Sequence, residues 1–286
     1  MKILVTGGAG FIGTNVVRHL LSDYDASVVN LDKLTYAGSN PPLGDLTTEE
    51  NYNLEIADIE DRERVKGIFA RFQPHAVMHL AAETHVDRSI DSPDDFISTN
   101  LVGTFTMLEV AREYWLQLPT PERARFRFLH ISTDEVFGSL IPNTKATEQS
   151  RYEPNSPYAA TKAGADHLVR AWHYTFGLPV ITTNCTNNYG PWQFPEKLIP
   201  LMILNALEGR ELPVYGTGFN VRDWLYVEDH AKALGKVLVQ GRVGETYNIG
   251  SGAERTNIDI VRELCLILDE ELHCSPHRPH ERLSAS

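Results

Sequence analysis

Cysteine and long apolar runs are both scarce in this sequence. Its 286 residues include three cysteines, Cys185, Cys265 and Cys274, which form no CxxC pair and leave an odd thiol over, so a disulfide framework is not expected. No stretch approaches the roughly 18 to 20 uninterrupted apolar residues of a membrane span. The N-terminus runs straight into a predicted strand, without the basic start and apolar core of a signal peptide. We therefore expect a cytoplasmic protein that does not cross a membrane.

Positive charge is scarce as well. The chain has 26 Lys and Arg against 38 Asp and Glu, a formal net charge of -12 at pH 7, and no Lys/Arg-rich run. This balance disfavours nucleic acid as a partner, although a few cations and backbone amides can still hold a small phosphorylated ligand. The 42% hydrophobic content is enough for a sizeable core in one large domain or two unequal ones.

Short β-rich runs alternate with helical patterns along the first two-thirds of the chain. Strands are predicted at residues 2–6, 27–32, 53–58, 76–81, 126–132 and 180–186. Helices are predicted near residues 11–22, 61–72, 94–116 and 157–176. This alternation is typical of βαβ units, so the predicted fold class is α/β with a doubly wound parallel sheet, the Rossmann arrangement.

The pattern loosens after about residue 187, where NNYGPWQFPEKLIP is rich in Pro, Asn and aromatic residues. No repeat or low-complexity linker separates the two parts of the chain. We therefore predict a Rossmann domain over residues 1–186 and a smaller lobe, packed on it, over residues 187–286. In such folds ligands bind beyond the carboxyl ends of the strands.

A glycine-rich turn, VTGGAGFIG, follows the first predicted strand and opens the first predicted helix. It places Gly8, Gly10 and Gly13 in the spacing GxGxxG, and Asp32 closes the second strand nineteen residues past Gly13. Such glycines let the backbone approach a pyrophosphate, which then lies on the amides of the helix N-terminus. Asp32 can bond an adenosine ribose and repel the extra phosphate of NADP, so the predicted cofactor is NAD. The alternative is a set of turn glycines with a capping aspartate.

Tyr158 and Lys162 lie four residues apart in the helix opened by Asn-Ser-Pro, and therefore on one face. A lysine ammonium beside a phenol, with the positive nicotinamide nearby, favours the phenolate and lets tyrosine act as a base near neutral pH. The spacing YxxxK also occurs by chance on helix surfaces. Here it follows a dinucleotide fingerprint and a Ser/Thr-bearing strand end, which favours the catalytic interpretation.

Two adjacent carboxylates, Asp134 and Glu135, follow Thr133 at the end of the apolar segment RFRFLHIS. At the mouth of a buried strand, neighbouring carboxylates repel each other and resist desolvation. A pair of carboxyl groups whose pKa values are pushed apart suits one base and one acid. An isolated Asp-Glu is more often a solvated turn, and the other motifs of this chain favour a catalytic pair.

These motifs together resemble the extended short-chain dehydrogenase/reductase family and, within it, the dTDP-glucose 4,6-dehydratases. The similar segments are AAETHVDRSI (81–90), STDEVFGS (132–139), PNSPYAATKAGADHLVRAW (154–172), NCTNNYGPWQFPEKLIP (184–200) and NVRDWLYVEDH (220–230). The resemblance runs from residue 1 to about residue 283, and related epimerases and decarboxylases lack the adjacent Asp-Glu. It implies a lyase of deoxysugar biosynthesis that uses NAD and acts on dTDP-glucose.

The resemblance also implies a role for each catalytic residue. Tyr158, assisted by Lys162, removes the O4 proton while hydride leaves C4 for NAD, and the new ketone acidifies the C5 proton. Glu135 then abstracts that proton, while Asp134, kept protonated, donates to the departing C6 hydroxyl. Hydride returns to C6, which regenerates the cofactor and gives the 4-keto-6-deoxy sugar. Thr133 would bond the O4 region and position the sugar.

Two sets of binding residues follow from the same resemblance. The cofactor set contains Tyr158 and Lys162 together with Gly7, Gly10, Phe11, Ile12, Gly13, Asp32, Lys33, Thr35, Asp58, Ile59, Leu80, Ala81, Ala82 and Thr99. The substrate set contains Thr133 together with Thr84, Asn187, Lys197, Leu198, Pro213, Tyr215, Arg222 and Asn257. Cationic and amide donors suit a diphosphate. Taken singly, Arg222 or Lys197 would more often be a surface charge. An aspartate at the position of Asp58 caps a helix about as often as it contacts the adenine of a cofactor.

The C-terminal segment HCSPHRPHERLSAS departs from the family. Its histidines and cysteine, His273, Cys274, His277 and His280, have no second ligand pair with closed-site spacing, so no metal is expected. In the family a similar segment precedes an Arg-bearing RPGxDxRY motif that completes the nucleotide pocket. The sequence therefore predicts a truncated chain with an incomplete substrate lobe.

Two predicted helices, 94–116 and 157–176, carry more apolar residues than one sheet-facing stripe requires. These residues are Phe105, Leu108, Leu168 and Trp172. Related enzymes pair such helices into a four-helix interface, so a homodimer is expected.

Two other functions are compatible with the same motifs. A 4-epimerase or decarboxylase of this fold would keep the glycine turn and the Tyr158 and Lys162 pair, although Asp134 beside Glu135 disfavours it. A protein that binds NAD without turnover would fit an incomplete substrate lobe. Detection of a 4-keto-6-deoxy product from dTDP-glucose distinguishes the three.

Overall fold

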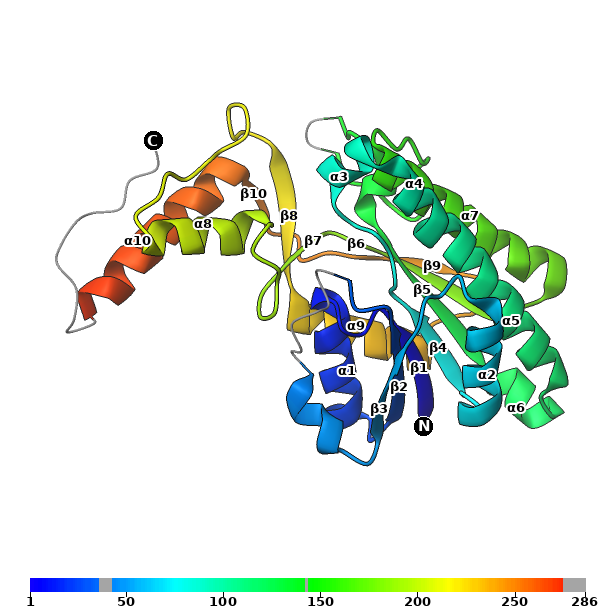
Figure 1. Ribbon diagram of the computed structural model, residues 1–286. Helices are drawn as coiled ribbons and strands as arrows, with labels where there is room; N and C mark the ends of the chain where they lie inside the picture. Colours follow the sequence, from blue (N-terminus) through cyan, green and yellow to red (C-terminus); the bar gives the residue numbers. More distant parts are fainter. Residues whose placement is uncertain (36–42, 142–143, 275–286) are drawn as a thin grey trace. The chain divides into compact units, whose positions relative to one another are not determined.

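The computed structural model describes residues 1–35, 43–141 and 144–274, which form two compact units. The first unit combines Met1–Cys185 with Val227–Ile249, and the second combines Thr186–Tyr226 with the chain from Gly250 onward. The sequence predicted two consecutive domains, residues 1–186 and residues 187–286, whereas each observed unit combines two separate segments of the chain. The chain returns to the first unit after residue 226 and adds one helix and one strand to it (Figure 1).

Among the described residues, seven parallel strands form the sheet of the first unit. In spatial order they are β3 (Tyr52–Ile56), β2 (Ser27–Asp32), β1 (Lys2–Thr6), β4 (Ala76–His79), β5 (Arg127–Thr133), β6 (Val180–Cys185) and β9 (Thr246–Ile249). The order changes direction at β1, which pairs with β2 on one side and with β4 on the other. The predicted doubly wound sheet is confirmed, and β1 and β4 form the switch point at which such sheets bind ligands.

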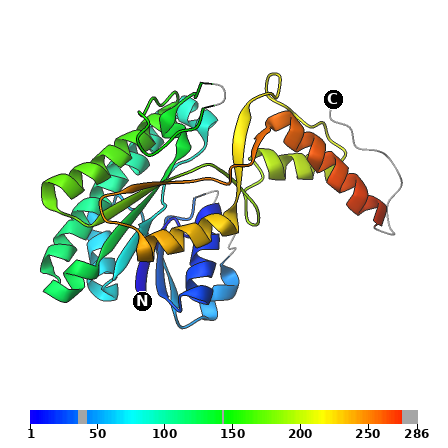
Figure 2. The ribbon, with the colours of Figure 1, turned by 180° about the vertical axis from the view of Figure 1, so that it is seen from behind.

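Helices cover both faces of this sheet. On one face lie α1 (Phe11–Asp23) and α9 (Val227–Gln240), and on the other lie α2 (Arg62–Phe72), α5 (Thr104–Gln117) and α7 (Pro157–Phe176). Leu20 of α1 and Leu234 of α9 share one apolar cluster with the sheet, while Phe69, Met107 and Val169 belong to the other. Both ribbon views show α1 beside α9 (Figures 1 and 2).

The sequence predicts α7 with its observed ends because its start and stop signals are local. The Ser156 side chain accepts a hydrogen bond from the Ala159 amide, and Pro157 occupies the first helical position. Gly177 ends the helix in the left-handed conformation, with φ of 74°.

The helix predicted over residues 94–116 is divided into three parts: α4 (Pro93–Phe96), the π-helical segment η2 (Ile97–Gly103) and α5. Such π-helical turns within α-helices are frequent at functional sites. Asn100 on η2 bonds both the amide and the carbonyl of Glu83 and also the Thr161 hydroxyl. The remaining short elements of the first unit are η1 (Gly44–Thr48), α3 (Val86–Asp91), α6 (Thr120–Arg125) and η3 (Asp134–Phe137).

In the second unit, the described residues form a three-stranded sheet and two helices. The strands are β10 (Glu254–Thr256), β8 (Val221–Tyr226) and β7 (Asn187–Tyr189), with β8 antiparallel to β10 and parallel to β7. The helices α8 (Leu198–Leu207) and α10 (Asn257–Cys274) lie side by side and share a small apolar cluster that includes Met202 and Val261 (Figure 2). Within the described parts of the chain, no helix has the length and apolar character needed to cross a membrane.

Candidate active site

The glycine turn between β1 and α1 brings backbone segments unusually close together. Gly7 has φ of 72°, and a side-chain carbon at Gly13 would lie 2.1 Å from the Gly7 carbonyl oxygen. Gly10 precedes α1 without a capping side chain, and the first turn of α1 has no acidic residue. The amide-rich start of α1 is therefore open to an anionic group, which fits the pyrophosphate of NAD.

Asp32 at the end of β2 is bonded to this turn. Its Oδ2 accepts the Ala9 amide at 2.9 Å, and its Oδ1 accepts the Leu34 amide at 2.8 Å. Burial raises the pKa of the Asp32 carboxyl, and the two amide bonds oppose that shift. Each carboxylate oxygen has more than one acceptor position, so Asp32 can support the glycine turn and still accept a ribose hydroxyl. Sequence reasoning missed Asn30, whose Oδ1 accepts the Gly8 amide at 2.9 Å.

Lys33 links several further residues of the predicted cofactor set. Its Nζ donates to the Thr99 hydroxyl at 3.1 Å and lies 3.7 Å from Asp58 Oδ2 and 3.8 Å from Glu83 Oε1. Burial raises the pKa of Glu83, and Lys33 opposes the shift. The cap of α2 is Asp61, so Asp58 does not have the helix-capping role that the sequence left open.

The rest of the predicted cofactor set lies at the same end of the sheet. Phe11 and Ile12 begin α1, and Thr35 follows β2 in the described chain. Leu80, Ala81 and Ala82 follow β4, where the Ala81 amide donates to the Thr6 hydroxyl at 3.2 Å. Ile59 is buried, and a side-chain carbon at Gly103 would meet it at 2.4 Å.

The three residues Thr133, Asp134 and Glu135 form the transition from β5 into η3. The Glu135 amide donates to the Thr133 hydroxyl oxygen at 3.2 Å, and that hydroxyl lies 3.4 Å from Asp134 Oδ1. Thr133 is buried, whereas both carboxylates are partly exposed. Gly138 ends η3 with φ of 70°, and a side-chain carbon there would lie 2.0 Å from the Glu153 carbonyl oxygen. The carboxylates are thus held on a tight, constrained turn at the end of β5.

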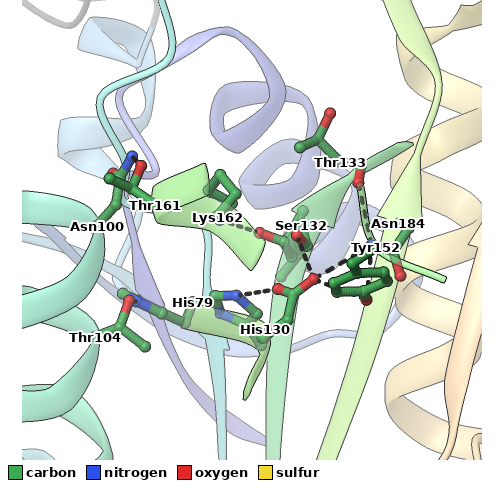
Figure 3. Close-up of polar contacts among 12 residues, drawn as sticks. His79, Asn100, Thr104, His130, Ser132, Thr133, Tyr152, Thr161, Lys162 and Asn184 are labelled. Atoms are coloured by element: carbon green, nitrogen blue, oxygen red, sulfur yellow. Dashed lines mark hydrogen bonds and ion pairs between the residues drawn. The ribbon is translucent and has the colours of Figure 1, made fainter. Parts of the chain in front are cut away.

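Tyr158 and Lys162 are almost wholly buried on α7. Burial raises the pKa of Tyr158 well above its usual range, the charge of Glu135 raises it further, and a hydrogen bond with Thr133 opposes the shift. Lys162 Nζ donates to the Ile131 carbonyl oxygen at 2.9 Å (Figure 3). The expected lowering of the Tyr158 pKa is therefore not produced by the chain's own residues, because burial and a neighbouring carboxylate outweigh the groups that favour the phenolate.

A buried polar network behind the predicted catalytic residues was missed from the sequence. Asp166, one helical turn after Lys162, lies within hydrogen-bond distance of side chains from β5, β6 and the Tyr152 segment. Figure 3 labels these neighbours, which are His130, Ser132, Asn184 and Tyr152. Burial lowers the pKa of His79 and of His130 below the usual range. The four-residue spacing from Tyr158 to Lys162 to Asp166 was a signal that could have found this carboxylate.

The second unit carries most of the predicted substrate residues. Arg222 on β8 is directly opposite Arg255 on β10, and Arg255 Nη1 lies 3.8 Å from Glu263 Oε2. Asn257 begins α10, and its buried Oδ1 has no hydrogen-bond partner among the described residues. The other predicted residues are Asn187 on β7, Lys197 and Leu198 at the start of α8, and the exposed Pro213 and Tyr215. Thr84, in the first unit, is also exposed.

Metal ligands and disulfides were not expected from the sequence. In the described ranges, no group of three or more His, Cys, Asp or Glu side chains is arranged to hold a metal ion. His277 and His280, and the side chains of His273 and Cys274, lie outside the described part of the chain. Cys185 and Cys265 are both buried thiols, and the Cys185 thiol donates to the Ser132 carbonyl oxygen at 3.4 Å.

The parallel sheet, the glycine turn after β1 and the Tyr158 and Lys162 pair on α7 define a dinucleotide-binding protein of the short-chain dehydrogenase/reductase class. Residues 4–283 match the model of the family described as GDP-mannose 4,6 dehydratase. The chain therefore belongs to this family of nucleotide-sugar dehydratases.

Individual relatives agree with the resemblance to dTDP-glucose 4,6-dehydratases. The Escherichia coli dTDP-glucose 4,6-dehydratase is 58% identical over 285 residues, which cover 96% of this chain and 79% of the relative. The corresponding protein of Neisseria meningitidis serogroup B is 57% identical over 279 residues, covering 97% and 78%. The crystal structure of the Bacillus anthracis dTDP-glucose 4,6-dehydratase in complex with NAD aligns with a TM-score of 0.85 at 43% identity, covering 94% of this chain and 81% of that one.

Epimerases of the same fold are more distant. The Thermus thermophilus UDP-glucose 4-epimerase complex with NAD aligns with a TM-score of 0.81 at 28% identity, covering 93% of this chain and 83% of that one. The comparisons therefore favour the dehydratase over the epimerase interpretation.

Proposed function

We propose that this chain is a hydro-lyase that converts dTDP-glucose to its 4-keto-6-deoxy product with NAD as cofactor. The names of the curated relatives support this substrate, and the NAD complex of the Bacillus anthracis relative supports the cofactor. The observation that carries the proposal is the set of side chains around the Tyr158 phenol. Its phenol bonds Thr133 and experiences the charges of both Glu135 and Asp134.

In the first step, Tyr158 removes the proton from O4 of the sugar. Thr133 bonds the same region and orients the sugar, and Lys162 supplies positive charge on the face of α7 that carries Tyr158. When bound, NAD would accept hydride from C4 and return it to C6. The first unit would hold this cofactor through the glycine turn, Asp32 and the Lys33 cluster.

In the second step, the ketone at C4 makes the C5 proton acidic. Glu135 abstracts that proton, and Asp134 gives a proton to the C6 hydroxyl, which leaves as water. One carboxylate is thus the base and its neighbour the acid, which explains why two carboxyl groups stand together at the end of β5. The positions of both on the constrained turn of η3 support this assignment.

The second unit would bind the nucleotide part of the substrate. Arg222 and Arg255 lie opposite each other on β8 and β10, and with Lys197 and Asn187 they offer cationic and amide donors suited to a diphosphate. Pro213 and Tyr215 would border the nucleoside, and Asn257 offers an amide that has an unbonded oxygen.

A homodimer and a cytoplasmic location remain part of this proposal. The four helix residues expected at a dimer interface are not equivalent, because Leu108 is fully buried in the core and Leu168 packs against that core. Phe105 remains 40% exposed and contacts Trp172, which in turn contacts Phe176. This aromatic row on α5 and α7 supports pairing of the helices in a second copy. A monomer mass by light scattering at micromolar concentration would contradict it.

The proposal is tested by incubating the chain with dTDP-glucose and following the sugar by NMR. A 4-keto-6-deoxy product supports the dehydratase function. A C4 epimer would support the epimerase alternative, and bound NAD without product would support the non-catalytic alternative. UDP-glucose and GDP-mannose, assayed under the same conditions, test the choice of nucleotide and should give much lower turnover.

A further inference from the structure

The carboxylate of Asp166 is the centre of a buried hydrogen-bond network that the proposed reaction steps do not use. Asp166 is 5% exposed. Its Oδ1 lies 3.1 Å from His130 Nε2, and its Oδ2 accepts hydrogen bonds from the Ser132 hydroxyl at 2.9 Å and the Tyr152 hydroxyl at 3.0 Å (Figure 3). A buried carboxylate bonded from several sides is fixed in position and remains an acceptor.

This network extends directly to the catalytic end of β5. Asn184 on β6 lies 3.4 Å from Asp166 Oδ2, and its amide also donates to the Thr133 carbonyl oxygen at 3.1 Å. Ser132, which bonds Asp166, immediately precedes Thr133 in the chain. The backbone on which Thr133 lies is thus connected to Asp166 through Ser132 in its own strand and through Asn184 in the next.

The charges around Lys162 identify a second role for the same carboxylate. Lys162 interacts electrostatically with His79 of β4, His130 of β5, Cys185 of β6 and Asp166 of α7. Burial lowers the pKa of both histidines, which are therefore neutral near pH 7. His130 Nδ1 has no hydrogen-bond partner in the described structure, which agrees with a proton on Nε2 facing Asp166.

Asp166 follows Lys162 by four residues on α7, so the two side chains lie on the same face of the helix. Burial also lowers the pKa of Lys162, and the nearby Asp166 carboxylate opposes that shift. Tyr158, one turn before Lys162 on α7, has a raised pKa and is neutral in the chain as described. Among these groups on β4, β5, β6 and α7, Asp166 is the carboxylate that favours the protonated lysine. Removing its charge therefore leaves a buried ammonium without that compensation.

We propose that Asp166 is a positioning residue of the active site, which keeps Lys162 charged and fixes the end of β5 that carries Thr133. The inference rests on the proposed function, in which a protonated Lys162 assists Tyr158. In that scheme the Asp166 carboxylate contacts neither the sugar nor the cofactor, and it acts through Lys162, Ser132 and Asn184.

The test is an NMR titration of Lys162 in the chain as purified with its cofactor. Lysine labelled with carbon-13 at Cε gives a signal for Lys162 that is assigned by its loss in Lys162→Arg. In Asp166→Asn, which keeps the size of the side chain, Lys162 should lose its proton about one pH unit or more below wild type. The alkaline limb of the pH profile of kcat with dTDP-glucose should move in the same direction. In Asp166→Glu, both the Lys162 titration and the alkaline limb should return most of the way to their wild-type positions.

Tyr152→Phe is the matched control, because it removes one hydrogen bond from Asp166 and leaves the charge in place. It should lower thermal stability without moving the Lys162 titration. An unchanged titration in Asp166→Asn would overturn the proposal. If that variant does not fold, the same titration is made on Asp166→Ser, which also removes the charge: a fall of about one pH unit or more supports the proposal, and an unchanged Lys162 titration overturns it. The titration needs no substrate, so a failure of the proposed function appears separately, as absence of product from the wild-type chain.

Discussion

The ammonium of Lys162 on α7 donates a hydrogen bond to the carbonyl oxygen of Ile131 on β5, over 2.9 Å. Ile131 lies two residues before Thr133, which itself bonds the Tyr158 phenol. The lysine therefore connects the helix that carries the proposed base to the strand that carries the proposed carboxylates. Burial and the Glu135 charge both raise the pKa of Tyr158, so positive charge nearby is needed for the phenolate to form.

Replacing Lys162 by methionine should lower kcat by at least about 100-fold, since a positioned acid-base group contributes on the order of 10² to 10⁴. Residual activity should increase with pH, because Tyr158 then ionises only under more alkaline conditions. Lys232→Met is the control, as the Lys232 side chain is 60% exposed on α9. A pH–rate profile of Lys162→Met that parallels wild type at reduced height would contradict the electrostatic role.

Glu135→Gln should abolish dehydration and the exchange of the C5 proton with solvent, while NAD remains bound. The amide keeps the shape of the side chain but cannot accept the C5 proton. Proton NMR of the sugar in D₂O measures both product and exchange. Glu63→Gln, whose side chain is 86% exposed on α2, should behave as wild type. Near wild-type turnover by Glu135→Gln would remove Glu135 from the mechanism.

Asp32→Ala should affect both stability and cofactor choice. The Ala9 and Leu34 amides lose their acceptor, which costs about 1 to 3 kcal/mol of stability for each amide left unsatisfied. Loss of the carboxylate should also narrow the preference for NAD over NADP, measured by calorimetric titration of cofactor-free protein. Asp32→Asn keeps an acceptor for one amide, so it should narrow the preference with less loss of stability. Equal affinity of the unmutated chain for both cofactors would contradict the role of Asp32.

The stability of the fold should fall between pH 7.5 and pH 5 in part through His230 of α9. Burial lowers the pKa of His230 to about 4, whereas an unfolded histidine titrates near 6.5. As the pH falls, the unfolded state binds this proton first, so the stability present above about pH 6.5 is lost toward pH 4. The contribution of His230 to the free energy of unfolding therefore falls by about 2 kcal/mol between pH 7.5 and pH 5.

Urea denaturation of His230→Gln at the two pH values measures that contribution. The variant should lose about 2 kcal/mol less than wild type over the interval, whatever its stability at pH 7.5. His167→Gln removes an exposed histidine of α7 and should keep the wild-type difference. Equal differences for wild type and His230→Gln would show that His230 does not titrate as its burial requires.

Local signals explain which elements could be predicted from the sequence. Ser156, Pro157 and Gly177 fix the ends of α7 through their own backbone and side-chain chemistry. The π-helical segment η2 was not predictable in this way, because Asn100 bonds Glu83 and Thr161 from distant parts of the chain. Strand β9 was missed for a similar reason: it has four residues, and its place in the sheet depends on pairing with β6.

The candidate site shows the same difference between local and distant information. The glycine turn, Tyr158 with Lys162, and Thr133 with its carboxylates are each short motifs whose chemistry is readable from spacing. The role of Asp166 depends on Ser132, Tyr152 and Asn184, which the fold gathers from three separate segments. Burial, which spacing does not reveal, raises the pKa of Tyr158 in the chain alone, so the predicted phenolate depends on Lys162 and on the positive nicotinamide of bound NAD.

The most direct test of the account uses dTDP-glucose that carries deuterium at C4, incubated with the wild-type chain and analysed by NMR and mass spectrometry. A single active site that oxidises C4, removes water across C5 and C6 and reduces C6 should give a 4-keto-6-deoxy sugar with that deuterium at C6. In D₂O with unlabelled substrate, one solvent deuteron should appear at C5. A product that has lost the C4 label to solvent, or a C4 epimer that retains its C6 hydroxyl, would contradict the account.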